Sequence, residues 1–328
     1  MESWLRRNLC ASDIPLTLLE EVVAFMKPIE LEITNWMIDH SEILQSAERF
    51  FLEFRWNSNG TINRIKTANS IINSDSFCDK TRFVLACHYW SSWDVFTLFQ
   101  SFRKSSRKLI LFDYAKTNKD PYRQKTNVDL WIKMCREGSI DKSPSRWCNS
   151  LIWTDVSVQS RLLNRLSAKD REHLLGRTFE NTHKIHTGRF CLSKMSASNR
   201  EQLLNLYPLK VLMIYLFWPY QKFFLDSANR VWDQLSEKDF TCLLHIIICQ
   251  KIVALWKDFD YVELLRQFWQ KSPDRLKKHL EGSVFFKRLM NIINHGFPPK
   301  EPRDYLLHGK DVDINADECK KQNNYFFL

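Results

Sequence analysis

The sequence predicts an all-α fold, specifically a helical-repeat solenoid of stacked helix pairs, and three observations support this prediction. The chain has 328 residues but only 7 glycines, which disfavours hairpins and phosphate-binding loops because both need positive φ angles. Serine-capped helix starts recur along the C-terminal half. No two segments of comparable quality look like paired strands, and an isolated strand is seldom stable. Helices joined by short polar turns are therefore expected.

A short phrase occurs three times and marks predicted helix starts. Each copy has a serine followed seven residues later by a leucine pair, and the serines are Ser167, Ser196 and Ser236. A serine at the N-cap accepts a hydrogen bond from an otherwise unpaired N–H of the first turn. Asp170 and Asp239, three residues on, can complete a capping box. Repetition of one helical unit favours a stacked array, with shared helix-start chemistry or a chance match as the alternative.

Two helices are predicted between Ile14 and Phe54. The first begins at Pro15, which suits a first turn, after a cap at Ser12 or Asp13. Its apolar stripe is Leu18, Leu19, Val22, Val23 and Met26. The second follows Ser41 and ends before Asn57–Gly60. It would carry Ile43, Leu44, Phe50, Phe51 and Phe54.

The next apolar segment, from Lys80 to Arg103, predicts two short helices hinged at Ser91-Ser92. We expect a helix at Leu109–Phe112 as well, because no strand is available to pair with it. The polar stretches Lys116–Asn127 and Gly138–Ser150 are predicted to be loops. The second loop is the expected boundary, giving an N-terminal helical half at 1–140, a C-terminal helical-repeat half at 141–299, and a mostly polar tail at 300–328.

In the C-terminal half, the helix after Ser236 has apolar residues around most of its circumference, so it is predicted to be covered on most sides. The helix after Ser167 should lie nearer the surface. A further start is predicted at Ser272, with Pro273 in the first turn and with Leu276, Leu280 and Phe285 on the helix. The apolar segment from Val211 is too short to span a membrane and is predicted to be a buried helix ending near Trp218.

The net charge of +10 arises from 48 Lys and Arg against 38 Asp and Glu, which favours acidic partners of some kind. The one dense basic run gives a candidate basic patch of Arg103, Lys104, Arg107 and Lys108. A solvated loop is the favoured interpretation of this run, and a nuclear-import or phosphate-contacting patch is the alternative. The 9 cysteines lack the paired spacing of a disulfide framework, and the first ten residues do not resemble a signal peptide. We therefore expect a cytoplasmic protein, with the nucleus as the alternative.

Two stretches resemble ankyrin repeats. Leu85–Trp90 followed by Trp93–Phe99 is similar to the helix-turn-helix of that family, with its L-A-C opening and its E-V-V-x-L-L run. Leu306–Asn315 resembles the ending L-L-x-H-G-A-D-V-N. The family's T-P-L-H opening is absent, and Ser91-Ser92 stands where glycine and histidine are expected. The resemblance implies a diverged ankyrin-like solenoid that serves as a protein-recognition scaffold.

Candidate chemical sites are few. Cys242, His245 and Cys249 are spaced at i, i+3 and i+7, but zinc would need a fourth ligand, so buried small side chains are favoured. A second cluster of His183, His186 and Cys191 falls in an expected loop and lacks the paired C-x-x-C pattern. No metal or cofactor site is therefore predicted.

Catalytic patterns are also lacking. Adjacent Cys87 and His88 would point apart on a helix, and the acids Asp258 and Asp260 are expected to be solvated beside Lys257. The G-x-S-x-G, H-E-x-x-H, phosphate-loop and dinucleotide motifs do not occur in the chain.

The C-terminal aromatic residues permit two interpretations. Interleaved with Lys222, Arg230 and Lys257, they resemble stacking platforms for nucleic-acid bases, yet helical arrays use such side chains mainly between layers. The residues concerned are Trp218, Tyr220, Phe223, Phe224, Trp232, Trp256, Phe268 and Trp269. The sequence therefore predicts a non-enzymatic protein-interaction scaffold built from helical repeats. The alternative is a nucleic-acid-binding helical array that uses its basic surface.

Overall fold

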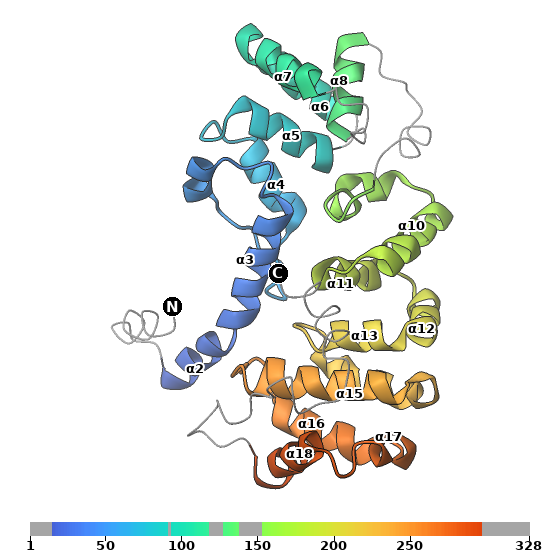
Figure 1. The fold of residues 1–328 in the computed structure, drawn as a ribbon. Coiled ribbons are helices and arrows are strands. Elements are labelled where there is room, and N and C mark those ends of the chain that lie inside the picture. Colours follow the sequence, from blue (N-terminus) through green and yellow to red (C-terminus); the bar gives the residue numbers. More distant parts are fainter. Residues whose placement is uncertain (1–14, 91–92, 118–126, 138–152, 297–328) are drawn as a thin grey trace. The chain divides into compact units, whose positions relative to one another are not determined.

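A computed structural model describes residues 15–90, 93–117, 127–137 and 153–296, and all regular secondary structure in these ranges is helical (Figure 1). Within the same ranges no strand forms, and Trp56 and Ile62 make an isolated antiparallel bridge. The all-α prediction is confirmed. The predicted boundary near residue 140 and the predicted tail at 300–328 lie outside the described residues. The arrangement of helix pairs as a solenoid stays a prediction.

The chain divides into two compact units. Unit 1 comprises Met1–Leu31, His183–Arg189 and Met195–Leu328, and unit 2 comprises Glu32–Thr182 and Phe190–Lys194. Each unit therefore contains residues from separate parts of the sequence, which adjacency along the chain does not reveal.

Unit 2 is built around α5 (Asp79–Tyr89), which packs against α4, α6, α7 and α8. Phe83 to Cys87 are all buried on this helix, and Trp131 of α8 donates an indole hydrogen bond of 3.2 Å to the Cys87 carbonyl. The helix is therefore covered on most sides. The other α-helices that lie wholly within this unit are α4 (Arg64–Ile72), α6 (Trp93–Ser101), α7 (Lys104–Thr117), α8 (Asn127–Glu137) and α10 (Ala168–Asn181). The two helices predicted between Lys80 and Arg103 and the helix at Leu109–Phe112 are confirmed.

The N-terminal helix forms as predicted, but its apolar stripe was assigned too broadly. Helix α2 (Leu16–Ala24) starts after Pro15 without a side-chain cap, and α3 (Met26–Asp39) follows it directly. Leu19 and Val23 are buried, whereas Leu18 and Val22 are 47% and 39% exposed. Periodicity gave the helix but did not decide which of two adjacent rows faces the core.

The helix predicted after Ser41 is wrong. The segment forms turns and a 3-10 helix (Ser46–Phe51), and Phe50 is 90% exposed. The physical reason is the buried Glu48 carboxylate, which accepts hydrogen bonds from the N–H groups of Gln45 at 2.9 Å and Cys78 at 2.8 Å. The hydroxyl of Thr81 donates a third bond of 2.8 Å. These tertiary bonds favour a tight turn over a continuous helix.

The three serine caps are confirmed. The hydroxyl oxygens of Ser167, Ser196 and Ser236 accept hydrogen bonds from the third helical N–H at 3.1, 3.3 and 3.1 Å. At Ser236 the carboxylate of Asp239 also accepts from the serine N–H at 3.1 Å, which completes a capping box. The phrase thus marks helix starts, as its chemistry predicts.

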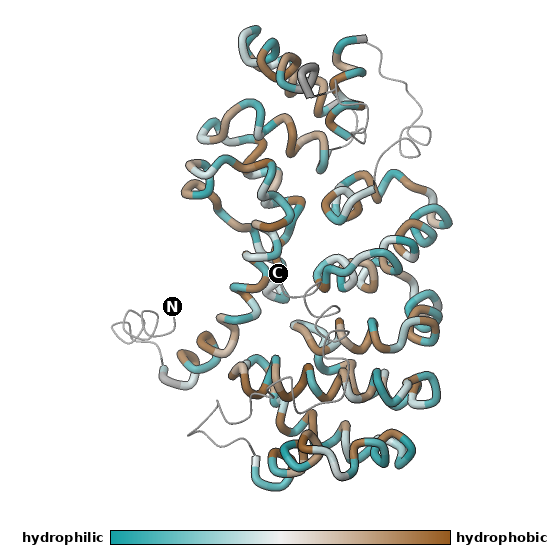
Figure 2. The backbone as a smooth tube through the Cα atoms, viewed as in Figure 1, coloured by the Kyte–Doolittle hydropathy of each residue, from teal (hydrophilic) through white to brown (hydrophobic). Residues whose placement is uncertain are grey.

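Of the helices predicted to start after Ser167, Ser196 and Ser236, the one after Ser236 is the most deeply buried, and it lies in unit 1. Helix α15 (Glu237–His245) continues as a seven-residue π-helix (Ile246–Ile252). Figure 2 shows the π-helical segment as strongly apolar, and α13 and α16 pack against this continuous stretch. The remaining helices are α11 (Ile185–Lys194, shared with unit 2), α12 (Ala197–Leu206), α13 (Pro208–Tyr215), α14 (Phe224–Arg230), α16 (Tyr261–Lys271), α17 (Asp274–Lys278) and α18 (Val284–His295).

Two details near the C-terminus of unit 1 differ from the prediction. The N-cap of α17 is Pro273, whereas the hydroxyl of Ser272 donates to the Trp269 carbonyl at the end of α16. Phe285 belongs to the next helix, α18, which Ser283 caps. Leu276, Leu280 and Phe285 are all buried, but only Leu276 lies on α17, which ends at Lys278, so the prediction of one helix carrying all three is wrong.

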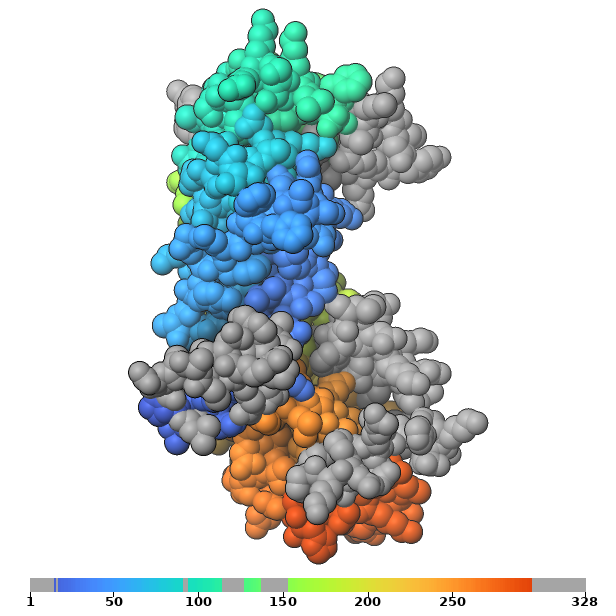
Figure 3. Space-filling model, turned by 90° about the vertical axis from the view of Figure 1, so that its left-hand side faces the viewer, coloured from blue at the N-terminus to red at the C-terminus, as the bar shows by residue number. Residues whose placement is uncertain are grey.

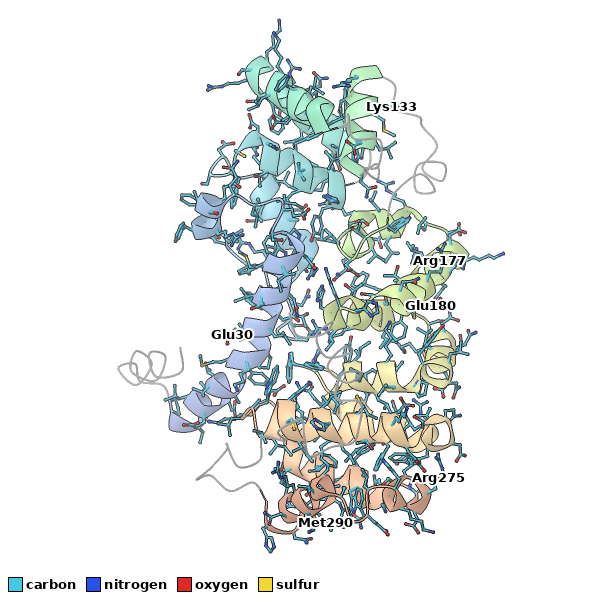
Figure 4. All side chains as sticks on the ribbon, viewed as in Figure 1. Glu30, Lys133, Arg177, Glu180, Arg275 and Met290 are labelled. Atoms are coloured by element: carbon cyan, nitrogen blue, oxygen red, sulfur yellow. The ribbon has the colours of Figure 1, made fainter. Side chains whose placement is uncertain are left out.

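Helix α10 (Ala168–Asn181) is amphipathic. Leu175 and Phe179 are fully buried, whereas Arg177 and Glu180 are exposed on the outer side of the helix (Figure 4). The helix after Ser167 therefore lies nearer the surface than the one after Ser236, as predicted.

Candidate functional site

The basic run predicted as a solvated loop is instead the start of a helix. Helix α7 begins at Lys104, directly after Arg103, and continues to Thr117. Because residues four apart lie one above the other on a helix, Lys104, Lys108 and Phe112 form one row. Leu109 lies in the neighbouring row. The prediction of a loop is wrong because the apolar residues that follow the charges belong to the same helix.

The structure brings together part of the predicted basic patch. Lys104 and Lys108 are exposed on the same face of α7, and Arg103 is exposed just before the helix. Arg107 lies outside the row, and its guanidinium donates a hydrogen bond of 2.5 Å to the Gln100 side chain of α6. The patch therefore consists of two aligned lysines and an adjacent arginine, with Arg107 engaged in contact with α6.

Leu109 and Phe112 extend this surface with apolar area. They are 58% and 63% exposed, among the most exposed large apolar side chains that the structure describes. We call the surface formed by Lys104, Lys108, Leu109 and Phe112 the α7 face. Contiguous exposed apolar area bordered by charge is typical of a binding surface.

Helix α7 is held by contacts with α5 and α8 as well as by its buried side. Ile110 is buried, and the Lys80 ammonium on α5 forms a 2.7 Å ion pair with Asp113. Arg136 of α8 donates a 3.2 Å hydrogen bond to the Leu111 carbonyl. In Figure 3 the blue-green atoms of α6 and α7 lie at the upper end of the view, with side chains projecting outward. The α7 face is thus displayed on an anchored helix.

A second cluster, in unit 1, was not anticipated from the sequence. Lys251 of the π-helix is fully buried, and its Nζ lies 3.6 Å from the ring centroid of Phe217 and 3.5 Å from that of Trp256. The Tyr261 ring lies 5.4 Å from the same nitrogen. The Lys251 Nζ has no hydrogen-bond partner among the described residues. We call this arrangement the lysine box.

Asp258 lies beside the lysine box. Its Oδ2 accepts a 2.6 Å hydrogen bond from the Gln221 side chain, and the Tyr261 hydroxyl lies 3.3 Å from the same oxygen. The other oxygen, Oδ1, is buried and has no hydrogen-bond partner within the described part of the chain. The prediction that Asp258 is solvated is therefore wrong. The nearby Asp260 instead caps α16, because its carboxylate accepts a 2.9 Å hydrogen bond from the Glu263 N–H.

Burial shifts both charged groups toward their neutral forms. Desolvation lowers the pKa of Lys251 well below its usual range, and the nearby Asp258 carboxylate opposes this shift only in part. Desolvation likewise raises the pKa of Asp258 against the opposing charge of Lys251. A neutral amine enclosed by aromatic rings is a nucleophile in principle, but its complete burial excludes any reactant that needs an open cleft.

The lysine box could be suspected from one sequence signal. Lys251 is the only charged residue in the apolar run from Ile246 to Trp256. Phe217, whose ring contacts Lys251, and Gln221, which bonds to Asp258, precede it by some thirty residues, so only the fold brings them together. The π-helix and the positive φ of 56° at Leu255 also lie here, and both features are frequent at functional sites.

The two cysteine-histidine clusters show no metal-binding arrangement, and no group of three or more His, Cys, Asp or Glu side chains suited to a metal occurs within the described residues. The π-helix changes the register between His245 and Cys249, and His245 stacks on Phe285 with ring centroids 5.5 Å apart. Burial raises the pKa of the Cys249 thiol to about 12, which disfavours a thiolate ligand.

The expected loop around His186 is wrong. Helix α11 begins at Ile185, and His186 and Cys191 are buried, whereas His183 is exposed before the helix. Burial at Cys87 and His88 also opposes nucleophile chemistry. It raises the pKa of the Cys87 thiol well above its usual range and lowers the pKa of His88 to about 4.

Most of the C-terminal aromatic residues pack within unit 1. Phe224 and Phe268 are fully buried with ring centroids 5.0 Å apart, and Phe240 lies 5.2 Å from Phe268. Phe223 is the exception, at 43% exposed. These rings serve mainly as core between helices rather than as an open stacking platform.

Comparison with protein-family models, curated proteins and solved structures finds no match to this chain. The residues that resemble an ankyrin helix-turn-helix do form consecutive helices, α5 and α6, but Leu306–Asn315 lies outside the described residues. The ankyrin-like assignment stays a prediction. None of the helices that the structure describes is both long and apolar enough to traverse a lipid bilayer.

Proposed function

We propose that this chain is a non-enzymatic protein-interaction module whose α7 face binds an acidic amphipathic helix of a partner protein. The observation that carries the proposal is the shared face of Lys104, Lys108, Leu109 and Phe112, in which Leu109 and Phe112 are 58% and 63% exposed. An amphipathic helix fits such a surface because its apolar row covers Leu109 and Phe112 while its acids lie beside the lysines.

The apolar residues favour a protein partner over nucleic acid. A phosphate backbone is recognised by cations and polar groups, and the exposed Leu109 side chain adds nothing to that recognition. Phe112 could stack on a base, but an isolated aromatic residue beside a leucine suits a helix contact better. Charge attraction then steers and orients the partner helix, and the burial of apolar side chains provides most of the binding affinity.

A stacked helical array in the cytoplasm is the setting we propose for this module. Rows of packed helices display side chains on a rigid frame, as α5 and α8 do for α7. No disulfide bond forms among the described cysteines, and buried Cys87 is a thiol, which supports a reducing compartment.

The proposal is tested with synthetic probes and the full chain at physiological salt. The first probe is an acidic helical peptide with Leu and Phe along one face. The second has the same composition but distributes its apolar residues around the helix, and the third is a nucleic-acid duplex. Fluorescence anisotropy should show tightest binding to the first peptide, because only that peptide matches both charge and apolar area.

Charge-reversal variants complete the test. The double variant Lys104→Glu with Lys108→Glu should lower the affinity for the first peptide by at least about tenfold. The matched control reverses Lys66 and Lys169, two exposed lysines of the same unit, and should leave binding unchanged. Equal binding of both peptides, or preferential retention of the duplex, would reject the proposed partner class in favour of polyanion binding.

A further inference from the structure

We propose that Ser105 is a phosphorylation site, at which a serine kinase that selects basic substrates adds a phosphate to the α7 face and thereby blocks its acidic partner. The observations are the exposure of Ser105, its position in the same row as Leu109, and the basic residues on both sides of it. The effect on the partner rests on the proposed function of the α7 face, whereas the modification itself does not.

Ser105 belongs to the α7 face by its position on the helix. It is the second residue of α7, and residues three, four and seven positions apart share one side of a helix. Lys108, Leu109 and Phe112 follow Ser105 at those three spacings, and all four residues are exposed. A group added to Ser105 therefore lies beside the residues that we propose to contact the partner helix.

The two nearest serines differ from Ser105. Ser106 is half-buried and shares its row with the buried Ile110. The hydroxyl of Ser101, at the end of α6, donates a 2.7 Å hydrogen bond to the Leu98 carbonyl. Of these three serines, only Ser105 is exposed and has a hydroxyl that makes no hydrogen bond with any residue that the structure describes.

The charges around Ser105 fit a kinase whose substrate groove contains carboxylates, because kinases select their substrates by such charge patterns. Four basic residues and no acidic residue lie within three positions of the acceptor, namely Arg103, Lys104, Arg107 and Lys108. The first turn of α7 also opens easily, since its N–H groups have no acceptor earlier in the helix and helix ends unfold locally at little cost. The acceptor segment can therefore enter a kinase groove while the rest of α7 stays packed.

The phosphoryl transfer needs only the kinase and its magnesium-bound nucleoside triphosphate. The Ser105 Oγ attacks the γ-phosphorus, and the bond from that phosphorus to the bridging oxygen of the leaving diphosphate breaks. The hydroxyl proton moves to a carboxylate of the kinase. The products are phosphoserine and a nucleoside diphosphate, and no atom is oxidised or reduced.

The phosphate removes the positive character of the α7 face. Phosphoserine carries a charge of about −1.5 to −2 near neutral pH, which offsets most or all of the positive charge of Lys104 and Lys108. Lys108 is also placed to pair with the phosphate, because an acid three residues before a base is favourable on a helix. An acidic partner helix then loses its attraction to the lysines and meets a negative group beside Leu109.

The modification is tested on the full folded chain with two purified serine kinases, one that selects basic residues around its acceptor and one that selects acidic residues. Mass spectrometry of the digested chain should place a phosphate on Ser105 with the first kinase only. Ser106→Ala should be phosphorylated as the natural chain is, and Ser105→Ala should not be. Phosphate on Ser106 instead, phosphorylation of neither serine, or equal modification by both kinases would overturn the proposal.

The effect on binding is tested with phosphoserine installed at position 105 of the full chain by genetic code expansion. At physiological salt, the acidic amphipathic peptide should bind this chain at least about tenfold more weakly than it binds the natural chain. The matched control carries phosphoserine at the exposed Ser58, elsewhere in unit 2, and should bind as the natural chain does. The melting temperature of the chain with phosphoserine at position 105 should not fall, because a negative charge near a helix N-terminus is favourable. A lower melting temperature would show that binding is lost through unfolding and would overturn the proposal.

The outcomes separate this inference from the proposed function. A natural chain that does not bind the acidic peptide would reject the partner proposed for the α7 face, and phosphate placed on Ser105 by the first kinase would still support the modification site. A natural chain that binds the peptide, together with an unchanged dissociation constant when phosphoserine is at position 105, would overturn the inference and leave the proposed function standing.

Discussion

His40 accepts a hydrogen bond from the Tyr89 hydroxyl in the core of unit 2, with 2.9 Å between Nε2 and the phenolic oxygen. Its other nitrogen, Nδ1, lies 2.6 Å from the Trp36 carbonyl oxygen. A carbonyl oxygen can only accept, so Nδ1 carries the proton and Nε2 accepts. Both ring nitrogens are thus satisfied only when His40 is neutral. The buried ion pair of Arg64 and Asp39, at 2.6 Å, lies close by.

The first prediction is a loss of stability in acid. Burial and the nearby Arg64 charge lower the pKa of His40 to about 3, and burial lowers that of His88 to about 4. Between pH of about 6.5 and 4 the unfolded chain binds protons at these sites that the folded chain does not, so stability falls as pH falls. Each histidine contributes about 1.4 kcal/mol per pH unit across this window, measurable by urea unfolding at a series of pH values.

Variants separate this effect from the titration of acids. Replacing His88 with Gln should reduce the slope of the unfolding free energy against pH by the equivalent of about one proton. The matched control is the exposed His183→Gln, which should leave that slope unchanged. A slope that is the same in His88→Gln as in the natural chain would show that His88 is not held neutral by burial.

The second prediction contrasts two repeated leucines. Leu243 on α15 is fully buried, whereas Leu174 on α10 is half-buried. Leu243→Ala should destabilise its unit by about 2 to 5 kcal/mol because a cavity forms in a covered helix, and Leu174→Ala should cost clearly less. The measurement is the free energy of unfolding in urea. Equal small losses would contradict the burial of α15 between neighbouring helices.

The third prediction ranks two helix caps of unit 1. Ser236 takes part in a complete capping box, whereas the Ser196 hydroxyl accepts from the Asn199 N–H at 3.3 Å and lies 3.2 Å from the Ser198 hydroxyl, with no carboxylate at the third helical position. Ser236→Ala should cost about 1 kcal/mol or more, and Ser196→Ala should cost less. Thermal unfolding of the two variants side by side tests this order, which would be refuted if Ser196→Ala were the more damaging change.

Local chemistry explains which elements could be predicted from sequence. The serine at position 236, its acid partner and the apolar run beyond it together predict the start and burial of α15. The Gln45–Glu48 capping contact at Ser46–Phe51 is local, but the bonds that Cys78 and Thr81 donate to Glu48 come from residues some thirty positions further along the chain. Apolar periodicity alone therefore suggested a helix that tertiary hydrogen bonds prevent.

The candidate sites show the same division. The basic run at Arg103–Lys108 was visible in the sequence, but its alignment with Phe112 depends on the helix that contains both. The lysine box joins the end of α13, the π-helix and the start of α16. Its partners converge only through packing, so a single lysine in an apolar run was the sole available signal.

The central claim, that the α7 face binds an acidic amphipathic helix, is tested most directly by removing its apolar part alone. Leu109→Gln with Phe112→Gln keeps both lysines and retains residues that favour helix. The dissociation constant for the acidic amphipathic peptide at physiological salt should rise by at least about tenfold, because two apolar side chains lose their contact. The matched control, Phe50→Gln with Phe51→Gln, changes side chains that are 90% and 57% exposed elsewhere in unit 2, and it should bind as the natural chain does. An unchanged dissociation constant for the Leu109 and Phe112 variant would contradict the claim.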